Sequence, residues 1–141
     1  MGAKIVDKLN IVIPMAGIGQ RFKDAGYTTQ KAFIEIAGKP MIQHALDAFP
    51  NSVARHLIIT KNAFDEAQID FLENTLNCNL IYIKPHKLGP AYSIYSATAD
   101  LPLDESIFIA YCDVYWTWDF GVIVENLNHE GIVFTHRKFH P

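Results

Sequence analysis

The feature that most constrains the fold is a regular alternation of short apolar runs, rich in β-branched residues, with longer segments that carry a helical apolar period. The first run, residues 10–15, is apolar throughout, which is typical of a strand buried on both faces. Strands and helices that alternate with short connections predict an α/β fold with a mainly parallel sheet and right-handed crossovers. The predicted strands are residues 10–15, 55–60, 79–84, 106–110 and 131–135, with a short extended piece at 32–36, and the predicted helices are residues 41–49, 62–75, 89–99 and 117–127.

Length and composition limit the class of protein. The chain has 141 residues, of which 50% are apolar and 19% charged, with a formal net charge of −3. This indicates one domain with a sizeable core and excludes both global disorder and a nucleic-acid binder with a broad basic face. No apolar run approaches the roughly 18 residues of a membrane span, so neither nucleic acid nor membrane is an expected partner. Cys78 and Cys112 form no C-x-x-C motif, which favours free thiols and a cytoplasmic protein.

The first site-like segment follows the strand at 10–15, at the end of a parallel strand where such sheets bind ligands. Gly17 and Gly19 allow a tight turn that brings backbone N–H groups close to a phosphate, and Arg21 adds a planar cation. A bare G-x-G is commonly only a tight turn. Phe22 stands where a dinucleotide fingerprint needs its third glycine, and no Gly-Lys-Ser/Thr follows, so the pattern favours a mononucleotide over NAD or a P-loop.

Lys31 and Asp113 are the other candidate residues. Lys31 would suit a phosphate-bearing substrate, although a lysine at the start of a strand is more often simply solvated. Asp113 comes just past the strand at 106–110, where a carboxylate can hold Mg²⁺ together with substrate phosphates, and the alternative is an aspartate that caps a turn or a helix. The neighbouring aromatic residues are interpreted as packing first and as ring or sugar contacts second: Tyr111, Tyr115, Trp116 and Trp118.

Two further features receive the weaker interpretation. The run Lys84-Pro85-His86-Lys87 could help to hold a phosphate, but a charged surface loop is the ordinary interpretation, and His86 itself is assigned no role. His136 and His140 are four residues apart, yet the Arg-Lys-Phe between them and the nearby end of the chain favour a solvated tail over a metal site.

The segments P-M-A-G-I-G-Q-R-F at 14–22 and G-Y-T-T-Q-K-A-F-I-E-I-A-G-K-P-M-I at 26–42 together resemble the N-terminal signature of the sugar-phosphate nucleotidylyltransferases, which make nucleoside-diphosphate sugars. The resemblance is clearest over residues 10–49 and continues through Gly89-Pro90-Ala91 and Tyr111-Cys112-Asp113. It implies a three-layer, Rossmann-like fold of the GT-A type. We expect residues 1–141 to form the N-terminal portion of such a domain, either as a fragment of a longer protein or as a reduced form that binds nucleotide without turnover.

The resemblance also implies roles for individual residues. In this family the glycine-rich loop and its arginine hold the nucleotide phosphates, a lysine meets the phosphate of the incoming sugar, and an aspartate after a central strand binds Mg²⁺. Arg21, Lys31 and Asp113 are therefore the expected catalytic residues, with Asp113 as the metal ligand. The implied nucleotide-binding residues are Ala16, Gly17, Gly19, Gln20 and Gly89.

The expected reaction is attack by a sugar 1-phosphate oxygen on the α-phosphorus of a nucleoside triphosphate, with Mg²⁺ as cofactor and pyrophosphate as leaving group. Three departures from the family pattern stand at Gln20, Gln30 and Cys112, where a small hydroxyl residue, proline and glycine are usual. The alternatives are a cytidylyltransferase acting on phosphocholine or a polyol phosphate and a non-catalytic nucleotide-binding module. The expected partners are the nucleotide and a phosphorylated small molecule. An exposed last strand would favour pairing with a missing segment or with a second chain, as in a homo-oligomer.

Overall fold

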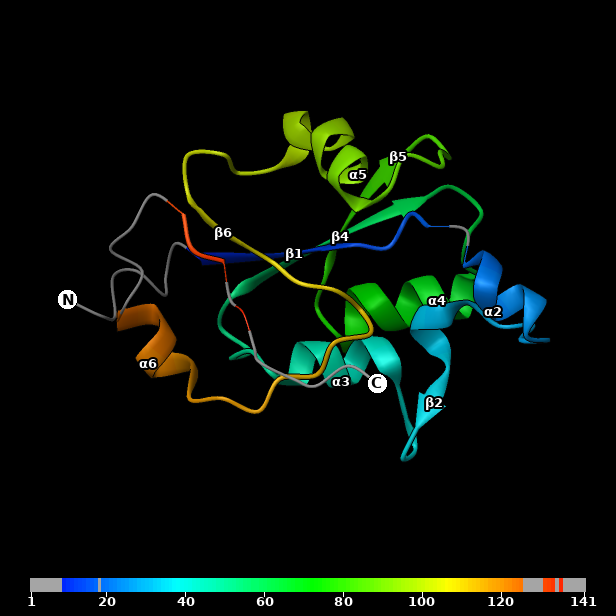
Figure 1. Cartoon of the computed structure of the whole chain (residues 1–141), viewed down its shortest axis with the longest axis horizontal. Helices are drawn as coiled ribbons and strands as arrows, with labels where there is room; N and C mark the ends of the chain where they lie inside the picture. The colour runs from blue at the N-terminus through cyan, green and yellow to red at the C-terminus, as the bar shows by residue number, and fades with distance from the viewer. Residues whose placement is uncertain (1–8, 18, 126–130, 134, 136–141) are drawn as a thin grey trace.

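The computed structural model describes residues 9–17, 19–125, 131–133 and 135. Within these residues the main sheet has four parallel strands in the order β5-β4-β1-β6 (Figure 1). The predicted parallel α/β sheet is therefore confirmed. Its strands are β1 (Leu9–Pro14), β4 (Ala54–Thr60), β5 (Asn79–Ile83) and β6 (Ser106–Ile109).

The order of the strands reverses at β1. The chain runs outward from β1 to β4 and β5, and then returns to the other side of β1 to form β6. Ile11 of β1 is registered with Arg55 of β4 on one side and with Phe108 of β6 on the other. In open parallel sheets such a reversal leaves a crevice at the carboxyl ends of the two strands that flank it, and ligands bind there.

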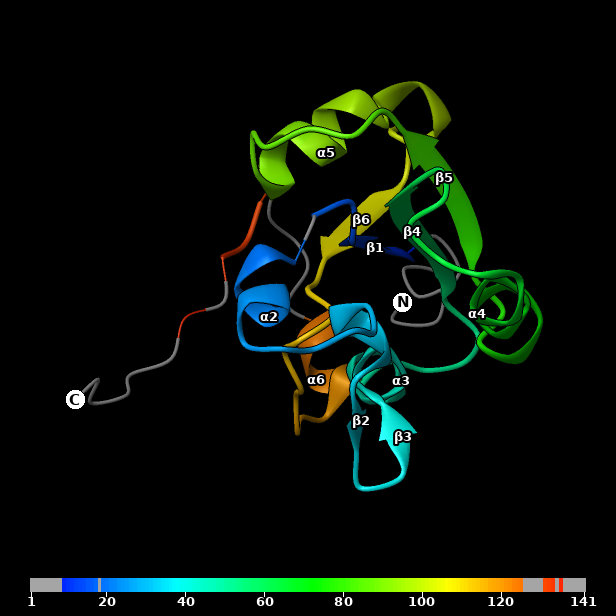
Figure 2. The same ribbon diagram turned by 90° about the vertical axis from the view of Figure 1, so that its right-hand side faces the viewer.

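Helices cover both faces of the sheet and give the predicted three layers. Successive side chains of a strand point to opposite faces, so Ile11 and Ile13 belong to one core cluster and Val12 to the other. The first cluster is covered by α3 (Met41–Asp47) and by the segment that begins with α4 (Glu66–Asp70). The second lies under α5 (Pro90–Ser96), and Figures 1 and 2 show α5 on one side of the sheet and α3 and α4 on the other.

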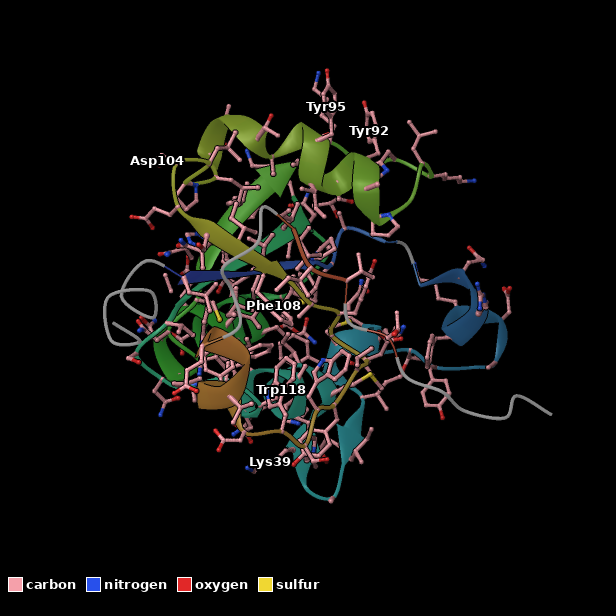
Figure 3. The ribbon with its side chains drawn as sticks, turned by 60° about the vertical axis from the view of Figure 1, so that its left-hand side comes forward. Lys39, Tyr92, Tyr95, Asp104, Phe108 and Trp118 are labelled. Atoms are coloured by element: carbon pink, nitrogen blue, oxygen red, sulfur yellow. The ribbon has the colours of Figure 1, made fainter. Side chains whose placement is uncertain are left out.

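An aromatic cluster fixes the chain that follows β6. The rings of Phe108 and Trp118 lie 5.4 Å apart at 84°, and Phe49 contacts both (Figure 3). The Trp118 indole N–H also donates to the Ala48 carbonyl at 2.8 Å. Residues 110–118 are thereby tied to the end of α3, which holds the segment containing Asp113 close to the carboxyl edge.

All four predicted helices differ from their predicted bounds, and the helix predicted at 41–49 is α3, which ends at Asp47. The helix predicted at 62–75 begins at Glu66, because Asp65 forms a capping box in which its carboxylate accepts from the Gln68 N–H at 2.8 Å and Gln68 Oε1 accepts from the Asp65 N–H at 3.2 Å. It continues as a π-turn over Phe71–Thr75. The helix predicted at 89–99 is α5 followed by a 3₁₀ turn (Thr98–Asp100), and the helix predicted at 117–127 is α6 (Phe120–Glu125), with residues 126 and 127 outside the described residues.

The extended piece predicted at 32–36 is mostly wrong. Lys31–Phe33 forms a 3₁₀ turn, and only β2 (Glu35–Ile36) is a strand, paired antiparallel with β3 (Lys39–Pro40). The hairpin turn has positive φ at Ala37 and Gly38, 49° and 79°, which is the twist that a two-residue hairpin favours. The segment packs beside α3, and Ala32 joins the core cluster on that face of the main sheet, so its apolar residues serve packing and not a long ladder.

The strand predicted at 131–135 is also wrong for its described residues. Residues 131–133 and 135 form no strand, and Val133 is 86% exposed. An apolar run becomes a strand only when a neighbour accepts its backbone hydrogen bonds, and β6 pairs only with β1 within the described residues.

Both cysteines are free thiols, as the sequence predicted. Burial raises the pKa of Cys78 to about 11, with the Arg55 charge opposing this rise, so the thiol stays protonated at neutral pH. Among the helices of the described residues, none has the length and apolar character needed to cross a membrane.

Candidate functional site

A cavity of about 590 Å³ opens at the carboxyl ends of β1, β5 and β6. Figure 2 looks onto this edge of the sheet, with α5 above it and α3 and α4 below. Five segments supply the walls: the end of β1 with its glycine loop, residues 30–32, Phe64 in the loop after β4, residues from 86 to 93, and residues 111–113. The cavity thus lies at the strand-order reversal, where the fold predicts a ligand.

The glycine loop forms the wall nearest β1. The Met15 N–H donates to the Ile58 carbonyl at 2.7 Å, so the pairing with β4 extends past the end of the strand before the chain turns. Gly19 has φ of 62°, a left-handed conformation that glycine adopts without strain, and α2 (Gln20–Asp24) starts directly after it. Gly17, Gly19 and Gln20 all line the cavity, and the Gln20 amide is held by the Asp24 carboxylate at 2.7 Å.

Two predicted loop residues are not part of the described lining. Ala16 is 3% exposed and contributes to the interior. Arg21 is exposed on α2. Contacts of these two residues with nucleotide phosphates stay predictions, and for Arg21 they require its side chain to turn toward the cavity when a ligand binds.

Lys31 and Asp113, separated by 82 positions in the sequence, meet in the cavity wall. The Lys31 ammonium donates to Asp113 Oδ2 in an ion pair. Their side chains are 30% and 40% exposed, so both groups remain accessible to a ligand. The Lys31 Nζ also lies 5.1 Å from the centre of the Phe22 ring, a favourable position for a cation over an aromatic face.

Gln30, which stands where the family commonly has proline, anchors the turn that carries Lys31. Its side-chain amide donates to the Ala63 carbonyl at 2.7 Å, and its own carbonyl accepts from the Phe33 N–H at 2.8 Å. The bond to Ala63 connects the Lys31 turn to the loop after β4, and the bond from Phe33 closes the turn itself. Gln30 therefore has a local structural role, the anchoring of the Lys31 turn, which does not depend on a ligand.

Cys112 stands where the family commonly has glycine. It lines the cavity next to Asp113 and is half-buried. Burial raises the pKa of its thiol to about 11, Lys31 acts in the opposite direction, and Asp113 adds to the rise. The group is therefore a protonated thiol at neutral pH and a poor nucleophile. Cys112 is therefore a poor candidate for a residue that forms a covalent intermediate.

His86, Lys87 and Ser93 also line the cavity. Sequence reasoning interpreted the run that contains His86 and Lys87 as an ordinary charged surface loop, and it did not consider Ser93. His86 Nε2 lies 2.9 Å from Ser93 Oγ, and His86 Nδ1 lies 3.1 Å from the Leu88 backbone nitrogen. The available signal was the position of His86 and Lys87 directly after the strand at 79–84, because the ends of parallel strands meet at one edge. Ser93 carries no such signal, since a serine in a short helix is unremarkable.

A second cavity of about 380 Å³ lies on the other side of Asp113. It shares Cys112 and Asp113 with the first cavity and is otherwise lined by α3, the β2 strand and the residues that follow Asp113. The His44 imidazole is 2.6 Å from the Ile36 carbonyl, and its ring meets the Tyr115 ring edge to face at 6.2 Å. Apart from these groups its walls are mostly apolar.

Residues 11–136 match the family of the MobA-like NTP transferase domain. The chain belongs to this family. The match spans the glycine loop, Lys31, the cavity residues of α5 and Asp113, and it confirms the nucleotidyltransferase resemblance found in the sequence.

Individual relatives act on different acceptors. The chain is 28% identical over 112 residues to a choline-phosphate cytidylyltransferase of Haemophilus influenzae, and 20% identical over 125 residues to a putative mannose-1-phosphate guanyltransferase of Sulfolobus acidocaldarius. Its structure resembles the nucleoside-diphosphate-sugar pyrophosphorylase of Vibrio cholerae, with a TM-score of 0.61 and 25% identity. The family membership therefore establishes nucleotidyl-transfer ancestry and leaves the acceptor open.

The chain spans about half or less of the length of these proteins. The matches cover 72%, 87% and 73% of this chain but 48%, 35% and 47% of the respective relatives, in the order given above.

Asp113 is the residue that fits a metal role. Within the described part of the chain, no three His, Cys, Asp or Glu side chains come together as a metal cluster. Mg²⁺ commonly uses one or two carboxylates and takes its remaining ligands from substrate phosphates and water. A single accessible carboxylate in the wall of this cavity therefore fits a Mg²⁺ ion that takes its remaining ligands from substrate phosphates and water.

Proposed function

We propose that this protein transfers a nucleoside monophosphate from a nucleoside triphosphate to a sugar 1-phosphate and releases pyrophosphate. The observation that carries the proposal is the pairing of Lys31 with Asp113 in the wall of a cavity that also contains Gly17 and Gly19. A cation, a carboxylate and a glycine turn with accessible backbone N–H groups are the parts needed to bind a metal-associated triphosphate. The structural similarity to a sugar-nucleotide pyrophosphorylase supports a sugar phosphate as the first acceptor to test.

In the proposed reaction an oxygen of the acceptor phosphate attacks the α-phosphorus, and the bond from the α-phosphorus to the oxygen of the β-phosphate breaks. The acceptor phosphate is already ionised at neutral pH, so no strong general base is needed. The protein's contribution is in-line positioning and neutralisation of charge. The glycine loop would bind the triphosphate, Lys31 would leave Asp113 to orient the acceptor phosphate, and Arg21 would stabilise the departing pyrophosphate.

Asp113 would hold Mg²⁺ in this proposal. When bound, the ion supplies positive charge that neutralises the phosphate oxygens during transfer. Asp113 pairs with the Lys31 ammonium in the ligand-free cavity. Ligand binding would therefore exchange one cation for another at the same carboxylate.

A second candidate acceptor is phosphocholine, with CTP as donor. Two observations favour it: the 28% identity to a choline-phosphate cytidylyltransferase and the mostly apolar second cavity next to Asp113. A trimethylammonium group binds well against an aromatic ring such as Tyr115 with a carboxylate nearby. A hexose would present several hydroxyl groups to apolar side chains such as Ile36 and Met41, which costs unpaired hydrogen bonds.

The proposal includes a cytoplasmic location, in keeping with the two free thiols. It also includes self-association as a prediction, because within the described residues the outer edge of β6 has no strand partner. Light scattering across a concentration series would measure the oligomeric state, and an unchanged monomer mass would remove that part.

The function is tested by measuring pyrophosphate release with CTP, UTP, GTP and ATP, each combined with glucose 1-phosphate, mannose 1-phosphate or phosphocholine, with and without Mg²⁺. Release that depends on a hexose 1-phosphate supports the first acceptor, and release only with CTP and phosphocholine supports the second. Nucleotide binding without pyrophosphate release from any pair would overturn catalysis and favour a non-catalytic nucleotide-binding module.

A further inference from the structure

The Lys31 ammonium has a second partner besides Asp113. Its Nζ lies over the face of the Phe22 ring, 5.1 Å from the ring centre. An aromatic face attracts a cation within about 6 Å, because the ring carries negative potential on its face. Figure 2 shows α2, which carries Phe22, at the carboxyl edge of the sheet. The proposed function uses Lys31 and Asp113 but gives Phe22 no task.

The Phe22 ring is held in place by the chain on both sides of it. The Phe22 N–H donates to the Gly19 carbonyl at 3.0 Å, which closes the first turn of α2. Gly26, with φ of 89°, reverses the chain, and the Tyr27 N–H donates to the Phe22 carbonyl at 3.0 Å. The Tyr27 ring meets the Phe22 ring edge to face, with centres 5.8 Å apart. The half-buried Phe22 ring is therefore a fixed surface tied to the glycine loop.

Binding of a metal-associated nucleotide changes what holds Lys31. In the proposed function Asp113 exchanges the Lys31 ammonium for Mg²⁺, so the carboxylate no longer attracts the lysine. The lysine stem is flexible, and an ammonium without a partner samples many rotamers that it must give up when a phosphate binds. Within the part of the chain that the structure describes, the ammonium has Asp113 as its hydrogen-bond and ion-pair partner and Phe22 as its ring partner. The ring contact does not depend on the carboxylate, so it can persist after the exchange.

We propose that Phe22 is a positioning residue, whose ring face keeps the Lys31 ammonium in the cavity wall when Asp113 binds the metal. The inference rests on the proposed function, because it assumes that Asp113 changes partners and that Lys31 receives the acceptor phosphate. Phe22 acts through Lys31, by reducing the conformational freedom that the lysine loses when the acceptor phosphate binds. Because Gly19 and Phe22 belong to one turn, this turn then serves both the nucleotide loop and the acceptor lysine.

The first experiment measures how tightly the acceptor binds when transfer is blocked. Dissociation constants of glucose 1-phosphate, mannose 1-phosphate and phosphocholine are measured with Mg²⁺ and α,β-methylene analogues of CTP, UTP, GTP and ATP. We expect Phe22→Leu to weaken binding of the accepted compound by about threefold to tenfold, the range for a cation over a partly shielded ring. Affinity for the nucleotide analogue should stay close to that of the wild type, because the bond from the Phe22 N–H to Gly19 is a backbone bond and remains.

Phe71→Leu is the matched control for this substitution. Phe71 is also a half-buried phenylalanine, but its ring contacts the Phe33 ring, with centres 6.0 Å apart, and it lies outside the cavity lining. Acceptor affinity in Phe71→Leu should match that of the wild type.

A second experiment tests the electrostatic attraction of the ring separately from its shape. A trifluorinated phenylalanine at position 22 keeps the ring and nearly its shape but removes most of the negative potential from its face. We expect it to lose most of the acceptor affinity that Phe22→Leu loses. This protein also provides the test if Phe22→Leu proves unstable.

A double-mutant cycle shows whether Phe22 acts through Lys31. The measured quantity is kcat/KM for the acceptor, which remains measurable when the acceptor binds weakly. Phe22→Leu alone should raise the KM for the acceptor by about the same factor as its dissociation constant and change kcat much less than Lys31→Ala does. In the Lys31→Ala background the ring has no ammonium to hold, so Phe22→Leu should cause no further loss of kcat/KM.

Three outcomes overturn the inference. An equal loss of acceptor and nucleotide affinity in Phe22→Leu would mean that the ring supports the glycine loop. Wild-type acceptor affinity in Phe22→Leu or in the fluorinated protein would mean that the ring face does not hold the lysine. Additive losses in the cycle would mean that Phe22 acts without Lys31. In all three cases the wild-type protein still binds and transfers, so the proposed function survives, whereas absence of acceptor binding and of pyrophosphate release in the wild type removes both.

Discussion

The polar side chains at the carboxyl edge of the sheet differ from those at the amino edge in their partners and in their exposure. At the amino edge, Asn10 donates to Glu105 at 2.8 Å and its oxygen accepts from His56 at 3.0 Å, which links β1, β4 and the start of β6. At the carboxyl edge, Lys31 and Asp113 pair with each other but remain partly exposed in a cavity. The amino-edge groups satisfy one another and contribute to the fold, whereas the carboxyl-edge groups are arranged so that a ligand can exchange with them.

The largest expected effect on activity comes from a substitution of Asp113 at the carboxyl edge. Asp113→Asn should reduce Mg²⁺-dependent pyrophosphate release by about 10³-fold, because the amide cannot neutralise the ion that carries the phosphates. The melting temperature should stay close to that of the wild type. Asp47→Asn is the matched control, since Asp47 forms a similar exposed pair with Lys39 at 2.9 Å on the β2–β3 hairpin, which Figure 3 shows far from α5. Wild-type turnover in Asp113→Asn would remove Asp113 from the site.

The next effect is expected at Lys31. Lys31→Ala should lower kcat by about 10²-fold and raise the KM for the phosphorylated acceptor, because one phosphate contact in the cavity is lost. Lys39→Ala serves as the control, with kinetics expected to match the wild type. A change confined to thermal stability in Lys31→Ala would instead support the interpretation of a solvated lysine that only neutralises Asp113.

A substitution of Arg55 at the amino edge should lower the stability of the fold and leave catalysis unchanged. Arg55 is 7% exposed, and its guanidinium donates to the Leu76 carbonyl at 3.1 Å and to Asn51 Oδ1 at 2.9 Å. Arg55→Leu leaves these acceptors unpaired, so we expect a loss of about 1–3 kcal/mol in the free energy of unfolding, measured by urea denaturation. Exposed Lys61→Met should change it by less than about 0.5 kcal/mol. A parallel loss of kcat at saturating substrate would show that the two edges are coupled.

The smallest effect concerns the pH dependence of stability at the amino edge. Burial lowers the pKa of His56 from its ordinary value of 6.5, with Glu105 acting in the opposite direction. The unfolded chain therefore binds the proton more readily than the folded chain. This contribution to stability is present above pH 6.5 and is lost as the pH falls through the lower folded-state pKa. Between pH 7 and pH 5, the free energy of unfolding should depend less on pH in His56→Gln than in the wild type. Identical slopes of the free energy of unfolding against pH in the two proteins would contradict a role for His56.

The sheet could be predicted from the sequence because its signals are local. Each main-sheet strand is a short apolar run with its own boundaries, and the four runs that precede residue 111 all form strands. The local sequence patterns gave wrong predictions where the secondary structure of a segment depends on what it packs against or pairs with. Residues 32–36 pack beside α3, and the described residues of 131–135 have no neighbouring strand to pair with. The start of α4 was missed because the capping box of Asp65 and Gln68 overrides the apolar period that begins three residues earlier.

The candidate site was predictable only in part. Motif resemblance drew attention to Lys31 and Asp113, and the parallel topology explains why two residues so far apart in sequence become partners. The pairing of His86 with Ser93 depends on how the loop after β5 folds back on α5, which no spacing rule reveals. Arg21 is the converse case. The motif predicts it as a site residue, yet its side chain is exposed and does not line the cavity.

The register between β1 and β6 determines how the chain can tolerate changes in length. Ile11 faces Phe108 in the parallel pairing, and the glycine loop and Asp113 each follow their strand after a few residues. Inserting one residue within β6 would turn its buried side chains toward the opposite face and carry Asp113 away from Lys31. An insertion at the Ala37–Gly38 turn would only lengthen the hairpin. Homologous chains should therefore vary in hairpin length while keeping the number of residues from Phe108 to Asp113 constant.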